Sequence, residues 1–72
     1  MFVGEYLNRK RNGKGKEYYS DGDLKFEGDY LNGLRNGKGK EYGNEKLIFE
    51  GRYLYGKKWE GKGYDNLGNN VY

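Results

Sequence analysis

The chain contains no cysteine, no histidine, no proline and no alanine among its 72 residues. Without cysteine it can form no disulfide and no thiolate metal site, and nothing in it indicates an oxidising compartment. Without histidine as well, the candidates for a general base or a nucleophile are reduced to carboxylates, tyrosine and lysine. We therefore expect no catalytic residue, no metal site and no cofactor, and we expect that the chain is not an enzyme.

Long apolar segments are also missing. No apolar run approaches the length of a transmembrane helix, and the start, MFVGEYLNRKR, lacks the apolar core of a signal peptide. We interpret the chain as soluble and cytoplasmic, either free or peripheral at a membrane or the cytoskeleton. The net charge of +3 is modest, so only the distribution of the charges can indicate a partner.

Glycine and aromatic residues are abundant, with 14 Gly, nine Tyr, three Phe and one Trp. Because glycine is a poor helix former and alanine is absent, this composition argues against a helical bundle. Charged residues make up 35% of the chain, which would suit disorder, but disordered chains are poor in aromatic residues. The aromatic side chains therefore indicate packing, within one small domain at most.

The octapeptide RNGKGKEY occurs twice, at residues 11–18 and 35–42. The similarity extends outward into three copies that open at Phe2, Phe26 and Phe49, which are 24 and 23 residues apart. A fixed period in this range is typical of stacked supersecondary units. We predict one array over residues 1–72, with repeats at about 2–25, 26–48 and 49–72, and interpret it as a fragment of a longer array.

Each copy has the pattern of a β-hairpin. In the second copy Phe26, Gly28 and Tyr30 alternate with Glu27 and Asp29, as expected for a strand with one packed face and one solvated face. The sequence therefore predicts an all-β fold, a single-layer antiparallel meander of three repeated β-hairpins with about six short strands.

The turns of this meander are predicted at glycine-containing dipeptides, because glycine and asparagine tolerate the positive φ angles that hairpin turns need. Asn32-Gly33 and Asn36-Gly37 are both expected in the turn of the second copy, followed by a strand from Lys38 to Tyr42. In the third copy 12 residues, rather than 11, separate the opening Phe from the first Gly of the G-K-G triplet, which indicates one additional turn residue near Trp59. The facing of the return strand stays open, and a bulge at Glu17 is one alternative.

The strand glycines also have a steric explanation. Gly28 falls between Phe26 and Tyr30 on the same predicted face, and Gly15 and Gly39 fall near the start of the return strands. A residue without Cβ leaves a gap in which a neighbouring ring can lie against the backbone. We expect a row of Phe and Tyr rings resting in these gaps.

The pattern F-x-G-x-Y-L-N-G-x-x-N-G-K-G-K, at this spacing, resembles the membrane occupation and recognition nexus (MORN) repeat, over nearly the whole chain. The resemblance implies an elongated, twisted sheet of hairpins that serves as a scaffold, with protein binding and acidic phospholipid binding as roles. The alternative it implies is a regulatory or membrane-targeting segment of a larger enzyme, such as a lipid kinase or a methyltransferase. Arg9 departs from the pattern by replacing the first turn glycine. The matching positions are Gly4, Tyr6, Gly13, Gly15 and Gly22 in the first copy, Gly28, Tyr30, Gly33, Gly37 and Gly39 in the second, and Gly51, Tyr53, Gly56, Gly61 and Gly63 in the third.

Basic residues cluster in and after the first turn of each copy, which holds 11 of the 14 Lys and Arg residues. In a stack of hairpins these turns share one long side of the sheet, so the sequence predicts a positive margin. It could bind phosphoinositide headgroups or an acidic protein segment, or it could be a solvated margin that keeps the protein soluble. The candidates for binding an anionic partner are Arg9, Lys10, Arg11, Lys14, Arg35, Lys38, Lys57, Lys58 and Lys62.

Trp59 is a candidate protein-interface anchor, because it is predicted in the longest turn, at residues 55–61, and exposed tryptophan is frequent at interfaces. The alternative is a turn cap that folds over Tyr53 or Tyr64. We expect a protein partner, and self-association through the two free sheet edges. Nucleic acid is not expected as a partner, because the rings are needed for the only apolar face and the net charge is low.

Overall fold

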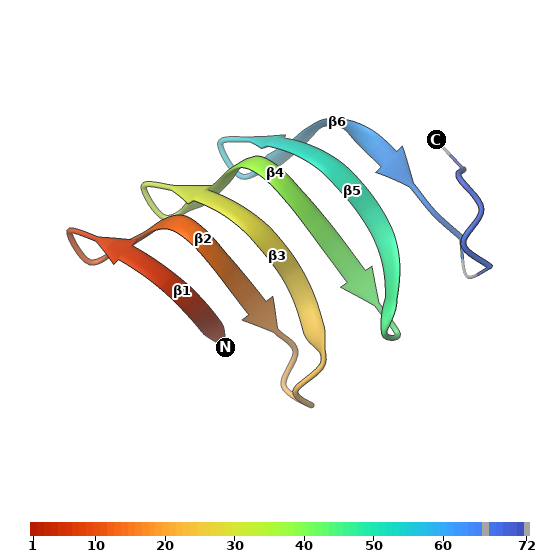
Figure 1. The fold of residues 1–72 in the computed structure, drawn as a ribbon, viewed down its shortest axis with the longest axis horizontal. Helices are drawn as coiled ribbons and strands as arrows, with labels where there is room; N and C mark the ends of the chain where they lie inside the picture. The colour runs from red at the N-terminus through yellow and green to blue at the C-terminus, as the bar shows by residue number, and fades with distance from the viewer. Residues whose placement is uncertain (66, 72) are drawn as a thin grey trace.

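The computed structural model describes residues 1–65 and 67–71, and this part of the chain forms one antiparallel sheet with the strand order β1-β2-β3-β4-β5-β6. The strands are β1 (Phe2–Leu7), β2 (Lys10–Tyr18), β3 (Leu24–Leu31), β4 (Leu34–Gly43), β5 (Lys46–Leu54) and β6 (Lys57–Gly63). Figure 1 shows the three hairpins side by side in a single curved layer, with extents of 40 × 28 × 13 Å. The predicted fold, a single-layer meander of three hairpins, is confirmed.

Two-residue turns close all three hairpins at the same end of the sheet, at the left in Figure 1. Asn32 and Gly33 have φ angles of 51° and 88°, as a type I′ turn requires at both central positions, so the turn predicted there is confirmed. In the first hairpin Asn8 and Arg9 have φ angles of 51° and 68°. Arg9 therefore adopts the left-handed conformation in the place where the other two hairpins have glycine.

The prediction that Asn36-Gly37 belongs to the turn, with a strand starting at Lys38, is wrong. β4 already begins at Leu34, and the Asn32-Gly33 turn is sufficient to reverse the chain. The register then changes between two pairs, from Tyr30 opposite Arg35 to Gly28 opposite Gly39, so extra residues of β4 bulge there. Gly37 has a φ of 108°, so its conformational freedom serves a bulge inside the strand.

The prediction of an additional residue in the third copy is also wrong. Gly51 pairs with Gly61 as Gly28 pairs with Gly39, so Gly61 corresponds to Gly39 and the third hairpin is one residue shorter at this place. Trp59 lies in β6 at the register shift, not in a turn. Aligning the third copy with the others on the G-K-G triplet gave the wrong correspondence, because glycine recurs at alternate positions of each return strand.

The apolar core is a single row of rings on one face, which we call the ring face. Phe26, Tyr30, Phe49 and Tyr53 are buried, and Phe2 packs against them. Each tyrosine lies edge-on between two phenylalanines: ring centroids are 5.0 Å apart for Phe2 and Tyr30 and 5.6 Å for Phe26 and Tyr30. The same contacts recur at 5.2 Å between Phe26 and Tyr53 and at 5.7 Å between Phe49 and Tyr53. This edge-to-face geometry is the favoured one for aromatic pairs.

The rings lie directly on strand glycines, as the sequence predicts. A Cβ atom added to Gly39 would lie 2.6 Å from the Phe26 ring and 3.0 Å from the Tyr53 ring. The register does shift between Glu17 and Tyr18, but the extra residue is Lys25 of β3, so the bulge considered at Glu17 lies on the neighbouring strand. The backbone of the return strands thus takes the place of the second layer that a single sheet lacks.

Replacing Gly28 by alanine should therefore disrupt the sheet. Its Cβ would collide with the Lys38 carbonyl oxygen and lie 2.6 Å from Gly39 Cα, and forced overpacking of this kind costs about 1–3 kcal/mol. Gly43→Ala is the matched control, because its Cβ would meet only the Ile48 side chain, at 3.5 Å. Urea unfolding should show a large loss for Gly28→Ala and little or none for Gly43→Ala; equal losses would contradict the close approach of the β4 backbone to Gly28.

Candidate functional site

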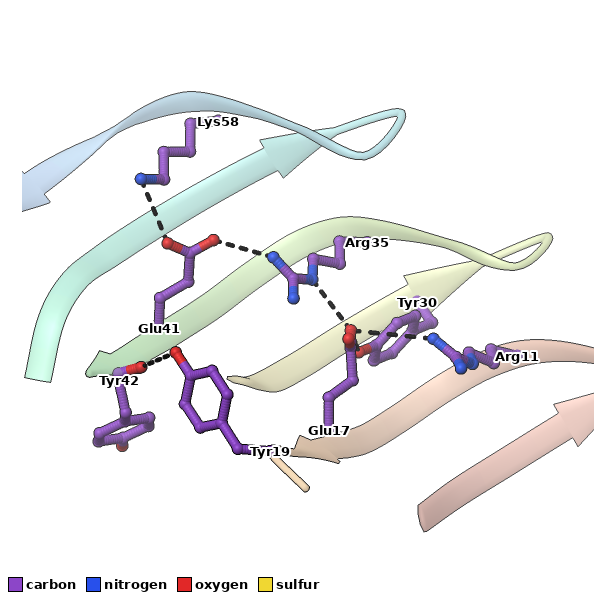
Figure 2. Close-up of polar contacts among 8 residues, drawn as sticks. All are labelled: Arg11, Glu17, Tyr19, Tyr30, Arg35, Glu41, Tyr42 and Lys58. Atoms are coloured by element: carbon purple, nitrogen blue, oxygen red, sulfur yellow. Dashed lines mark hydrogen bonds and ion pairs between the residues drawn. The ribbon is translucent and has the colours of Figure 1, made fainter. Parts of the chain in front are cut away.

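Five charged side chains cross the ring face as an alternating row, which we call the charge ladder: Arg11, Glu17, Arg35, Glu41 and Lys58. Figure 2 shows these side chains reaching toward one another across β2, β4 and β6. The nitrogen–oxygen distances along the ladder are 3.9 Å for Arg11 and Glu17, 3.0 Å for Glu17 and Arg35, 2.9 Å for Arg35 and Glu41, and 3.2 Å for Glu41 and Lys58. Each glutamate therefore joins the cation of its own hairpin to the cation of the next.

The cations of the charge ladder also cover the phenyl rings. The guanidinium carbon of Arg35 is 4.0 Å from the centroid of Phe26, and that of Arg11 is 4.3 Å from the centroid of Phe2. The Lys58 ammonium lies 4.7 Å from the centroid of Phe49. All three are within cation–π range, and only 19% of the Arg35 side chain is exposed. The ladder thus closes the solvent side of the ring row.

Tyr30 lies beside the ladder and contacts it directly, since its hydroxyl donates a hydrogen bond to Glu17 Oε2. Burial, and then this bond and the Glu17 charge, raise the pKa of Tyr30. Burial on its own would raise the pKa of Glu17 too. Hydrogen bonds from Arg35 and Tyr30, with the charges of Arg35 and Arg11, outweigh burial and hold it below its ordinary value.

The two buried tyrosines should respond differently to loss of the hydroxyl. Tyr30→Phe removes a hydrogen bond to a carboxylate, worth about 1.5–3 kcal/mol. Burial and then the nearby Glu41 carboxylate raise the pKa of the Tyr53 hydroxyl, but this hydroxyl has no hydrogen-bond partner of good geometry among the described residues, so Tyr53→Phe should cost less than Tyr30→Phe. Urea unfolding of both variants measures the difference, and a larger loss for Tyr53→Phe would contradict this geometry.

The charge ladder should make the stability of the fold depend on pH in the acid range. Because the pKa of Glu17 is lower in the folded chain, its contribution is complete above about pH 4.5, near the unfolded value, and is lost as pH falls through the folded pKa. Glu17→Gln should lower the melting temperature at neutral pH and flatten its decline in acid. Glu45→Gln, in an exposed turn, is the control and should keep the wild-type decline. Parallel curves for wild type and Glu17→Gln would show that this carboxylate does not stabilise the fold.

The opposite face of the sheet carries three of the predicted basic residues, Lys14, Lys38 and Lys62. Lys14 Nζ lies 2.6 Å from Asp29 Oδ1, and Lys62 pairs in register with Glu50. An open groove of about 470 Å³ runs over the central glycines between such side chains. Cross-strand neighbours along this face alternate in sign, in the order Lys16, Glu27, Lys40, Glu50 and Lys62.

Tyrosine hydroxyls link neighbouring strands outside the ring row. Tyr42 donates to Glu27 at 2.9 Å and Tyr64 donates to Glu50 at 3.0 Å. Burial and then the Glu27 hydrogen bond raise the pKa of Tyr42 to about 12. The Tyr19 hydroxyl donates to the Tyr42 carbonyl oxygen at 2.8 Å, which fastens the first repeat to the second (Figure 2).

The nine predicted basic residues therefore do not form one margin. Only Arg9, Lys10 and Lys57 lie at the hairpin ends, where they are exposed. The others are divided between the two faces, because side chains alternate along a strand and each bulge shifts that alternation. Arg11, Arg35 and Lys58 do occupy equivalent positions, each opposite the tyrosine of its own hairpin.

Exposed apolar side chains gather at the hairpin ends, and sequence reasoning did not single them out. We call this group the hairpin-end surface. The signal that could have found it is the leucine that follows the tyrosine, three residues after the glycine, in each copy, directly before each turn. The surface consists of Leu7, Leu31, Leu34, Leu54 and Tyr55, with exposed fractions between 42% and 70%.

Trp59 is 68% exposed. It contacts neither Tyr53 nor Tyr64 ring-to-ring within the part of the chain that the structure describes, so the geometry does not favour the turn cap. Its role as a protein-interface anchor stays a prediction.

Within residues 1–65 and 67–71, no group of His, Cys, Asp or Glu residues could hold a metal ion. The same part of the chain contains no helix long and apolar enough to cross a membrane.

Comparison with known proteins agrees with this architecture. The model of one family, described as MORN repeat, matches residues 2–24 and 26–45, which contain the first two hairpins. No curated protein and no solved structure matches the chain. The third hairpin lies outside the match, and it is also the one in which the return strand is one residue shorter and Trp59 stands in place of the Asn-Gly pair. Because the match covers more than half of the chain, the protein belongs to the MORN repeat family.

Proposed function

We propose that this MORN repeat scaffold binds a protein partner along its hairpin-end surface. The observation that carries the proposal is the exposure of Leu7, Leu31, Leu34, Leu54 and Tyr55 at one end of the three hairpins. Exposed apolar side chains that gather at one end of a sheet are candidates for an interaction site, whereas scattered single ones are not. The sheet itself serves as a rigid support that spaces these side chains.

The remaining surfaces are less suited to an apolar partner. On the ring face the aromatic row is covered by cations such as Arg35, and these are neutralised by Glu17 and Glu41. The opposite face is lined by charged side chains, including the row in which Lys40 and Glu50 are cross-strand neighbours. The hairpin ends repeat every two strands, about 10 Å apart, so they fit an extended or helical segment that crosses several turns.

A second candidate function is binding to an anionic phospholipid surface. Arg9, Lys10 and Lys57 are exposed beside the same leucines, and a basic residue near an anionic bilayer contributes about 1 kcal/mol. In this setting the chain would serve as the membrane-targeting or regulatory segment of a larger enzyme, or as a cytoplasmic scaffold peripheral to a membrane or the cytoskeleton.

Replacing Leu31 and Leu34 together by serine tests the protein-binding proposal. Both side chains are nearly half exposed, so stability should change by no more than about 0.5 kcal/mol each. Crosslinking and pull-down from the source cells should recover a partner with wild type and lose it with the double variant. Leu67→Ser, at a more exposed leucine outside the surface, is the control. A partner that still binds the double variant would place the binding surface elsewhere.

The lipid candidate is tested by co-sedimentation with phosphoinositide vesicles at low and at physiological salt. Electrostatic binding is screened by salt, and it should be lost when Arg9, Lys10 and Lys57 are changed to Gln. Lys16, Lys40 and Lys62→Gln on the opposite face is the control, with the same change in charge. Absence of binding at both salt concentrations, or equal loss in the two triple variants, would exclude a lipid site at the hairpin ends.

A further inference from the structure

The same set of contacts joins the first hairpin to the second and the second to the third. Toward the turns, the Gly33 amide donates to the Arg11 carbonyl oxygen and the Gly56 amide donates to the Arg35 carbonyl oxygen, both at 2.8 Å. The side chain of Asn12 accepts from the Asn32 amide at 3.3 Å, and that of Asn36 accepts from the Tyr55 amide at 3.0 Å. The asparagine of each RNGKGKEY segment therefore holds the turn of the following hairpin.

Glycine and glutamate of the same segment complete the contact. Gly15 lies under the Tyr30 ring, so that an added Cβ would be 3.1 Å from it, and Gly39 lies under Tyr53 in the same way. Glu17 accepts from both Tyr30 and Arg35 of the next hairpin. A return strand thus presents Asn, Gly and Glu, and the hairpin that docks on it supplies a tyrosine and a cation.

The outer strand β6 lacks two of these three groups. Gly61 is in the position of Gly39, opposite Gly51. Gly63 stands opposite Phe49, where Glu41 stands opposite Phe26, so the carboxylate is missing. Trp59 alone occupies the place of the Asn-Gly pair of the earlier copies.

The outer edge of β1, in contrast, has every group of a docking hairpin. Tyr6 is equivalent to Tyr30 but is 59% exposed, whereas Tyr30 is 4% exposed. Arg11 is equivalent to Arg35, yet its one ladder contact is a 3.9 Å ion pair with Glu17. No other strand of the described chain pairs with this edge of β1.

We propose that the β1 edge is a docking site for an antiparallel strand of a partner protein with the pattern Asn-Gly-x-Gly-x-Glu. The partner's glutamate would lie opposite Phe2 and bind Arg11 and the Tyr6 hydroxyl, as Glu17 binds Arg35 and Tyr30. Strand addition of this kind supplies affinity through main-chain hydrogen bonds and specificity through alternate side chains. The proposal rests on the scaffold function and adds to it a second surface, separate from the hairpin ends.

The β6 edge of a second copy of this chain is the wrong occupant for the β1 edge. Docking of β6 in the same register would bring Arg11 beside Lys58 of that copy, with Gly63 where a carboxylate is needed. Two cations without an acid between them disfavour this head-to-tail contact. The two free edges of the sheet therefore differ in what they can bind.

The test is an NMR titration of the ¹⁵N-labelled full chain with the peptide RNGKGKEYY, a copy of residues 11–19. Amide shifts should concentrate in residues 2–9 and at Arg11. A peptide with Glu replaced by Gln should bind at least about tenfold more weakly, because hydrogen bonds to a charged group are about twice as strong as neutral ones.

Two variants of the chain test whether the Tyr6 hydroxyl and the Arg11 guanidinium cause the stronger binding of the Glu peptide. Tyr6→Phe removes only the hydroxyl, and Arg11→Gln removes the cation, so each should reduce the discrimination between the two peptides. Lys58→Gln, the equivalent change at the far end of the ladder, is the control and should leave the discrimination unchanged. Spectra without peptide show whether each variant retains the fold.

Several outcomes would overturn the proposal: no shifts at millimolar peptide, shifts at β6 instead of β1, equal binding of both peptides, or head-to-tail oligomers that changes in β6 dissolve. The Leu31 and Leu34→Ser variant separates this proposal from the hairpin-end one, since it should bind the peptide like wild type. Peptide binding with no partner at the hairpin ends would support the β1 edge alone, and the reverse result would support the hairpin ends alone.

Discussion

Aromatic rings that rest on glycine backbone are the interaction on which the rest of this molecule depends. A single sheet has no second layer to bury its apolar face, and 72 residues leave no room for one. Here the backbone at Gly15, Gly39 and their equivalents serves as the surface against which Phe and Tyr side chains pack. The abundance of glycine, which weakens most strands, is in this chain the condition for having a core.

The charge ladder follows from that constraint. Rings that lie flat on one layer would expose their outer side to water, and Arg11, Arg35 and Lys58 cover it. The covering cations are in turn neutralised by Glu17 and Glu41. This explains why an identical octapeptide recurs: its arginine covers a ring, its Asn-Gly bulges and holds the next turn, its second glycine receives a ring, and its glutamate joins two hairpins.

The sequence was sufficient to predict the meander, because its period, its alternation and its Asn-Gly turns all indicate the same fold. It could not separate the roles of Gly33 and Gly37, since positive φ suits a turn and a bulge equally. The sequence also could not predict which acids pair with the basic residues. Glu17 contacts Arg35 only because of the register between strands, and without that register Arg35 is interpreted as one more residue of a positive margin. The hairpin-end leucines were missed because strand alternation assigns Leu31 to a face without indicating that it ends the strand.

Sharing of each glutamate between two hairpins gives the array a fixed order. In most repeat proteins a unit can be deleted, duplicated or exchanged with modest loss, because each one brings a complete interface. Here each hairpin brings a cation that needs the acid of the hairpin before it, and the third hairpin has Gly63 in place of that acid. An array shuffled so that the third unit came first or second would contain a break in the ladder and an unheld turn at its centre. The order of the three hairpins therefore matters, because the third has Gly63 and Trp59 where the first two have the glutamate and the Asn-Gly pair that hold the next hairpin.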